Sequence, residues 1–125
     1  MVTLNKIYTK TGDEGTTSLG NGVRTEKFSL RVKTYGSIDE INSNVGVAAH
    51  YADKALQTNL KNIQNDLFDL GADFCNPILE DKNNIKTSEL RVSYHQVKRI
   101  EQEIDLMNIS LEPLKSFVLP GGDIA

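Results

Sequence analysis

The stretch LQTNLKNIQNDLFDLGADFCNP, Leu56–Pro77, contains the clearest structural signal in this chain of 125 residues. Its apolar residues recur at alternating steps of four and three, the spacing that places side chains on one face of an α-helix. The Asn76-Pro77 pair ends the pattern, because proline cannot continue a helix. The recurring positions are Leu56, Leu60, Ile63, Leu67, Leu70 and Phe74. We expect this stripe to face the core of a helical bundle.

Two further segments show the same periodicity. One covers residues 30–52, where Gly36 and Gly46 weaken it, and the other starts near Ser88, whose hydroxyl can cap a helix. The first carries Tyr35, Ile38, Ile41, Val45 and Ala48 or Ala49, and the second carries Tyr94, Val97, Ile100, Ile104 and Met107. Strand alternation is not convincing anywhere, so the sequence predicts an all-α fold, an antiparallel helical bundle with an irregular N-terminal loop.

The N-terminal loop, residues 6–27 with the sequence KIYTKTGDEGTTSLGNGVRTEK, differs in composition from the rest. It holds four glycines, six Thr/Ser hydroxyls and the cations Lys10, Arg24 and Lys27, with few apolar side chains. Glycines let the backbone turn its N–H groups inward around an anion, and hydroxyls and cations add donors. Phosphate binding is one interpretation, and an ordinary loop of turn-forming residues is the other. The P-loop spacing is absent, because Lys10 precedes the first glycine.

Charge is distributed unevenly along the chain. Residues 1–35 carry a net charge of +3, and residues 36–125 carry −6. A short basic segment on an acidic body suits a small polyanion, whereas a protein that tracks a duplex needs a broad basic face. We therefore expect a nucleotide, and no nucleic acid, as the partner.

Length and composition predict one domain, residues 1–125, with a nucleotide-binding loop at 1–29 and a helical bundle at 30–125. The single Cys75 excludes an internal disulfide and is expected to be a small buried filler at the end of a helix. The chain has no signal peptide and no apolar span of 18 residues, so we expect a cytoplasmic protein without membrane contact.

Charged and metal-binding side chains outside the loop offer few candidates for a site. His50 and His95 lie on separate predicted helices without partners at ligand spacing, so no metal site is predicted. Asp66, Asp69 and Asp73 share part of a helical face, and we expect them to face solvent without a role.

Three motifs occur in a fixed order along the chain: TKTGDEGTTSL at Thr9–Leu19, YGSIDEINS at Tyr35–Ser43 and FVLPGG at Phe117–Gly122. Together they resemble the PduO-type ATP:cob(I)alamin adenosyltransferases, over about residues 6–122. The resemblance implies a helical-bundle subunit that assembles as a homotrimer. It also implies transfer of the 5′-deoxyadenosyl group of ATP to the cobalt of cobalamin, with release of triphosphate and with Mg²⁺ beside the phosphates.

The resemblance assigns an ATP site to the N-terminal loop. Thr17 and Ser18 would touch phosphate oxygens, and Lys27 would reach the triphosphate. Asp13 and Gly15 would shape the loop. The full predicted ATP-binding set is Thr9, Lys10, Thr11, Gly12, Asp13, Gly15, Thr17, Ser18, Arg24 and Lys27. Reduced cobalt is the nucleophile in this reaction, so the protein must hold the ribose C5′ in line with it and neutralise the departing triphosphate.

Two residues are predicted to be catalytic on the same grounds. Asp39 matches a family carboxylate that pairs with an arginine across a subunit contact near the corrinoid. Phe117 matches the family aromatic that occupies the lower face of the corrin and excludes the dimethylbenzimidazole ligand. On composition alone, Asp39 is typical of a solvated helix face and Phe117 of a core residue before a turn. The ordered motifs are what favour the catalytic interpretation.

The chain departs from the family after the Pro-Gly-Gly turn, where members continue into a helix with an ARxxxRRAER-like motif that completes the ATP site. We therefore expect the native chain to be longer, the apolar stripes of the bundle to be partly uncovered, and this truncated chain to have little transferase activity. Two rival hypotheses are a non-catalytic module that binds nucleotide or corrinoid, and a helical oligomerisation protein whose glycine loop is merely structural.

Overall fold

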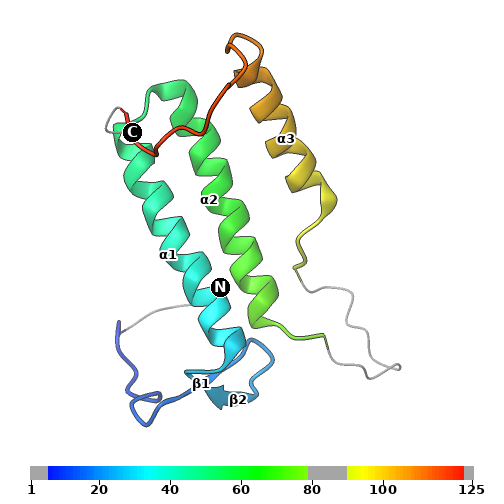
Figure 1. Cartoon of the computed structure of the whole chain (residues 1–125). Coiled ribbons are helices and arrows are strands. Elements are labelled where there is room, and N and C mark those ends of the chain that lie inside the picture. Colours follow the sequence, from blue (N-terminus) through cyan, green and yellow to red (C-terminus); the bar gives the residue numbers. More distant parts are fainter. Residues whose placement is uncertain (1–5, 79–89, 123–125) are drawn as a thin grey trace.

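The structure, a computed structural model, describes residues 6–78 and 90–122. A two-stranded sheet of β1 (Thr16–Ser18) and β2 (Arg24–Glu26) is followed by helices α1 (Leu30–Tyr51), α2 (Lys54–Cys75) and α3 (Tyr94–Asn108). The helices α1 and α2 lie side by side and antiparallel, and the sheet lies where α1 begins and α2 ends (Figure 1). The all-α prediction is confirmed, although it missed the two three-residue strands within the N-terminal loop.

A tight turn joins α1 to α2, close to the predicted boundaries. Ala52 ends α1, and the carboxylate of Asp53 caps α2 by accepting the N–H groups of Ala55 and Leu56, each at 2.9 Å. Such a cap satisfies two of the donors that the first turn of a helix leaves without a partner. The predicted end of α2 at Asn76-Pro77 is also confirmed, since the helix ends at Cys75.

The contact between α1 and α2 forms a small core that includes a buried polar pair. Ile38 is 8% exposed, Ala49 is 7% exposed and Asn42 is 5% exposed. The Asn42 side chain donates to the carbonyl of Gln64, and the Gln64 side chain donates to the carbonyl of Asn42, both at 3.2 Å. These paired hydrogen bonds join the buried Asn42 to the half-buried Gln64 and hold the helices in one register, although the Asn42 Oδ1 has no described partner.

The predicted apolar stripes are only partly correct. The α2 stripe is half-buried along most of its length, but Ile41 of the predicted α1 stripe is 52% exposed. The side of α1 that faces α2 runs through Ile38, Asn42 and Ala49, and Ile41 lies one position off that line. Large apolar side chains remain exposed on each described helix, and they include Val47, Phe68, Tyr94 and Ile104. The expectation that the apolar stripes are partly uncovered agrees with this exposure.

The helix α3 begins later than predicted, and its N-terminus is capped by residues other than Ser88. Ser88 lies outside the described residues, and α3 begins at Tyr94, where the N–H of Ser93 donates to the side chain of Gln96 at 2.7 Å. This is half of a capping box, and the Ser-x-x-Gln spacing signals it in the sequence. Most of the predicted apolar stripe of α3 is exposed and does not form a third wall of the core: Tyr94, Val97, Ile104 and Met107 are all exposed.

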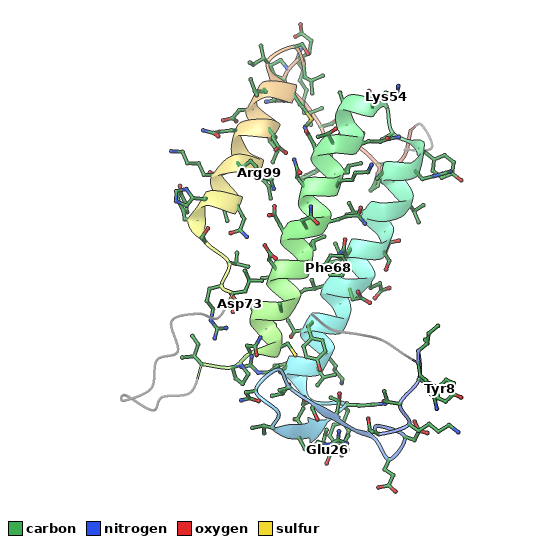
Figure 2. All side chains as sticks on the ribbon, turned by 180° about the vertical axis from the view of Figure 1, so that it is seen from behind. Tyr8, Glu26, Lys54, Phe68, Asp73 and Arg99 are labelled. Carbon is green, nitrogen blue, oxygen red and sulfur yellow. The ribbon has the colours of Figure 1, made fainter. Side chains whose placement is uncertain are left out.

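Ion pairs connect α3 and the segment before it to α2, which corrects the expectation that the aspartates of α2 only face solvent. Arg99, labelled on α3 in Figure 2, pairs with Asp66 on α2, and it also pairs with Glu103 at 3.1 Å. Arg91 Nη1 lies 2.6 Å from Asp73 Oδ1. The Val92 N–H, at 2.9 Å, and the guanidinium of Arg91 lower the pKa of the Asp73 carboxyl below its ordinary value of 3.8.

The C-terminal end of α2 joins three separate parts of the chain. The last carbonyls of any helix have no partner within the helix, so other donors must satisfy them when they are covered. Here the donors come from the β1–β2 turn, from α1 and from the segment before α3. The bonds are Gly20 N–H to Cys75 O at 2.9 Å, Arg31 Nη1 to Phe74 O at 2.7 Å, and Arg91 Nη1 to Asp73 O at 3.1 Å and to Asn76 O at 2.7 Å.

Replacing Asp73 by Asn is expected to destabilise the protein in a pH-dependent way. A carboxyl whose pKa is lowered by folding stabilises the folded state above its unfolded pKa, and that contribution disappears as the pH falls through the folded pKa. The variant should therefore lose about 1 to 3 kcal/mol of unfolding free energy at pH 7, and less below about pH 4. Urea unfolding of both proteins across this range measures the difference. A difference in unfolding free energy that stays constant down to pH 2 would contradict the stabilising role of the ionised Asp73 carboxylate.

Replacing Gly20 by Ala is expected to loosen the β1–β2 turn from α2. An added Cβ would lie 2.1 Å from Asn76 Oδ1, and the Asn76 amide is already held by its 2.9 Å bond to Ala72 O. We expect a loss of about 1 kcal/mol in unfolding free energy and faster hydrogen exchange of the residue 20 amide. The double variant that also carries Asn76→Ala should recover most of the loss.

The control for this prediction is Gly71→Ala, because a Cβ at Gly71 would meet nothing within 4 Å. That variant should be as stable as the original or up to about 1 kcal/mol more stable, since alanine favours helix over glycine. Equal effects of the two substitutions would show that the Gly20 contact with α2 contributes nothing.

Candidate functional site

The N-terminal loop is organised around the β1–β2 hairpin. Thr16 pairs with Glu26 and Ser18 with Arg24 in an antiparallel register. The turn closes with Leu19 N–H bound to Val23 O at 2.8 Å, and Gly22 takes φ +82°, a backbone conformation that favours glycine. The Gly-Asn-Gly sequence is therefore a hairpin turn, which also carries the contact of Gly20 with α2.

Strand alternation divides the predicted phosphate-binding hydroxyls between two faces of the hairpin. Thr16 and Ser18 lie on one face, and both hydroxyls accept hydrogen bonds from the guanidinium of Arg24. Thr17 lies on the opposite face and is half-buried. Thr17 and Ser18, which were predicted to contact phosphate together, therefore lie on different faces, and Thr16 was not among the predicted residues. The period-two spacing of Thr16 and Ser18 was the signal that could have included it.

A turn at Gly12 brings the loop back to the hairpin. Gly15 N–H donates to Gly12 O at 3.2 Å, and Lys27 N–H donates to Gly15 O at 2.8 Å. A Cβ at Gly12 would lie 2.9 Å from both Lys27 Cε and Thr16 O, so only glycine lets the chain approach so closely. The ammonium of Lys27 consequently lies against the backbone of the Gly12 turn.

The residues before Gly12 contribute hydroxyls and a second cation. The hydroxyls of Thr9 and Thr11 lie 3.0 Å apart in a hydrogen bond. Lys10 takes φ +58°, and its ammonium lies 5.6 Å from the centre of the Tyr8 ring. Asp13 is exposed at the tip of the turn. The predicted loop residues therefore form one polar, mostly exposed surface around the hairpin, at the lower end of the molecule in Figure 2.

The YGSIDEINS motif continues away from this surface along α1. Burial and the neighbouring Cys75 raise the pKa of the Tyr35 phenol, so it stays neutral beside the end of α2. Cys75 itself is half-buried, less than the buried filler that was expected. Asp39 is exposed on α1, one turn further from the hairpin. No described hydrogen bond or ion pair in residues 6–78 or 90–122 joins the Asp39 carboxylate to the loop.

Phe117 is the predicted site residue that lies farthest from the others. It is 107% exposed, in an irregular segment that follows α3. That segment runs across the end of the molecule where α1 passes into α2, opposite the hairpin (Figure 1). A helix of 22 residues, the length of α1 and of α2, spans about 33 Å. The loop and the segment with Phe117 therefore lie at opposite ends of α1 and α2.

The described residues contain neither a metal-binding cluster nor a membrane-spanning helix. Within residues 6–78 and 90–122, no group of three His, Cys, Asp or Glu side chains is placed to hold a metal ion. Across the same ranges, every helix is too short or too polar to span a bilayer.

Comparison with known proteins gives consistent matches. The family model described as cobalamin adenosyltransferase matches residues 7–125. The corrinoid adenosyltransferase of Mycobacterium leprae is 43% identical over 121 residues, which cover 95% of this chain and 63% of that protein. The corrinoid adenosyltransferase of Bacillus subtilis is 42% identical over 122 residues, covering 94% and 59%. The chain thus spans less than two thirds of the length of these relatives.

Solved structures agree with the sequence comparison. A variant PduO-type ATP:corrinoid adenosyltransferase from Lactobacillus reuteri, complexed with cobalamin and ATP, superposes with a TM-score of 0.81 at 32% identity. The match covers 94% of this chain and 65% of that one. Both kinds of comparison, together with the three ordered motifs, place this chain in the cobalamin adenosyltransferase family.

Proposed function

We propose that the protein transfers the 5′-deoxyadenosyl group of ATP to the cobalt of cob(I)alamin and releases triphosphate. The observation that carries this proposal is the N-terminal loop, where the ammonium of Lys27, the Gly12 turn and several hydroxyls gather beside the hairpin. Relatives that share this region are named corrinoid adenosyltransferases, and one solved relative is complexed with cobalamin and ATP. Both substrates are proposed for this chain from that similarity.

The proposed chemistry is a displacement at the ribose C5′ of ATP. The cobalt electron pair forms the new cobalt–carbon bond, and the bond from C5′ to the triphosphate oxygen breaks, so the leaving group departs with added negative charge. Lys10 and Lys27 would stabilise that charge, and the loop hydroxyls and N–H groups would orient the phosphates. The proposed ATP site consists of Thr9, Lys10, Thr11, Gly12, Asp13, Gly15, Thr17, Ser18, Arg24 and Lys27.

Mg²⁺ is part of the proposal as the companion of the triphosphate. The exposed carboxylate of Asp13 and the hydroxyls of Thr9 and Thr11 are oxygen donors of the kind this ion takes, directly or through water. The ion would neutralise phosphate charge that two lysines alone leave unbalanced.

We further propose that the complete site lies between subunits of a homotrimer. The N-terminal loop and the segment with Phe117 lie at opposite ends of α1 and α2, and a transfer reaction needs both of its substrates in contact. A second copy of the chain could bring its own Phe117 and Asp39 to the loop. We also propose that residues 1–29 and 30–125 are the nucleotide-binding loop and the helical bundle of one domain of a cytoplasmic protein.

The test is anaerobic mixing of the protein with MgATP and chemically reduced cobalamin. We expect a light-sensitive cobalt–carbon product and release of triphosphate when the helix that family members carry after the Pro-Gly-Gly turn is present, and little product from these 125 residues alone. Lys27→Ala should weaken ATP binding by about 1.5 to 3 kcal/mol, because a charge-assisted contact is lost. The matched control is Lys98→Ala, which removes an exposed lysine on α3 and should leave ATP binding unchanged.

Three results would count against the proposal in different ways. Binding of ATP and cobalamin without product, even when the helix after the Pro-Gly-Gly turn is present, would favour a non-catalytic binding module. Absence of ATP binding by calorimetry would favour a structural role for the glycine loop. Equal effects of Lys27→Ala and Lys98→Ala would mean that the nucleotide binds elsewhere.

A further inference from the structure

Arg24 is surrounded by acceptors from its own loop. Its Nη2 donates to the backbone carbonyl of Thr11 at 2.9 Å and to the hydroxyl of Thr16, while Nη1 donates to the hydroxyl of Ser18 at 3.3 Å. A guanidinium has five N–H donors, two of them on each terminal nitrogen. Both donors of Nη2 are therefore engaged, together with one donor of Nη1. The side chain is exposed, yet the greater part of its hydrogen-bonding capacity is used within the loop.

These contacts join two segments that are separated in the sequence. Thr16 and Ser18 belong to β1, so their bonds to Arg24 stay within the hairpin. The bond to Thr11 reaches 13 positions back to the Gly12 turn, which otherwise rests on the backbone bonds of Gly15. Arg24 therefore fixes the position of the turn relative to the sheet.

The bond to Thr11 also orients a peptide group. A trans peptide is planar, and its C=O and N–H point in opposite directions. Because the Thr11 carbonyl faces Arg24, the Gly12 N–H faces away from it. No acceptor within residues 6–78 or 90–122 takes that N–H, and Lys27 lies against the same glycine. An outward N–H beside an ammonium is a donor arrangement suited to a phosphate oxygen.

We propose that Arg24 is a positioning residue that presents the Gly12 N–H to the nucleotide and does not itself contact the triphosphate. This inference rests on the proposed function, because it concerns the same ATP site. It assigns different tasks to the cations of the loop: Lys27 meets the phosphates, and Arg24 holds the backbone that binds beside it. A single ammonium cannot replace Arg24 in this task, since it lacks the planar fork that reaches three separate acceptors.

The test compares Arg24→Lys, Arg24→Ala and Lys27→Ala by ATP calorimetry and by the carbonyl ¹³C resonance of Thr11 in the ATP-free protein. We expect both Arg24 variants to shift the Thr11 resonance and to bind ATP about tenfold more weakly, the equivalent of one good hydrogen bond. Lys27→Ala should weaken ATP binding and leave the Thr11 resonance in place. ATP added to the original protein should shift the amide ¹H resonance of Gly12, because that N–H would then donate to a phosphate oxygen.

The outcomes separate this inference from the proposed function. If Arg24→Lys binds ATP as well as the original protein, charge alone suffices and the positioning role is wrong. If the Thr11 resonance is the same in both Arg24 variants and the original protein, Arg24 does not hold the Thr11 carbonyl. If the original protein does not bind ATP, the proposed function fails, and a shifted Thr11 resonance would then assign Arg24 a purely structural bond.

Discussion

The carbonyl groups at the C-terminal end of α2 are the constraint on which this structure depends. A helix end leaves its last carbonyls without partners, and here the chain supplies donors from three directions. The N–H of Gly20 attaches the hairpin, Arg31 attaches the first turn of α1, and Arg91 attaches the segment before α3. Because one helix end holds all three, the N-terminal loop is positioned by the bundle although it contributes few apolar contacts.

Ion pairs take the place of apolar packing on the side of α2 that faces α3. The helix α3 leaves most of its apolar stripe exposed, and its described link to α2 is the pair of Arg99 with Asp66. The segment before α3 adds the contacts of Arg91 with Asp73. Partly exposed ion pairs contribute less than a packed core but require defined geometry. The acidic residues of α2 thus have a structural task, whereas an acidic helix face alone indicates only solvation.

The arrangement of the candidate site follows from the length of the helices. The polar loop and the segment with Phe117 occupy opposite ends of α1 and α2, and both carry motifs of the same family. This separation is the reason for the proposal that the complete site lies between subunits. Within the loop, the hydrogen bonds of Arg24 and the close approach of Lys27 to Gly12 hold the donors together.

Local pattern determined much of this protein: the spans of α1 and α2, the end of α2 before Pro77, and the motifs that indicate the family. These features depend on spacing and on individual residue preferences, which act between near neighbours in the chain. The tertiary structure alone decided the partners of Asp66 and Asp73, the exposure of Ile41, and the contacts of Arg24 with Thr11. Such contacts join residues far apart in sequence, and they form only when the helix end and the hairpin are brought together in space.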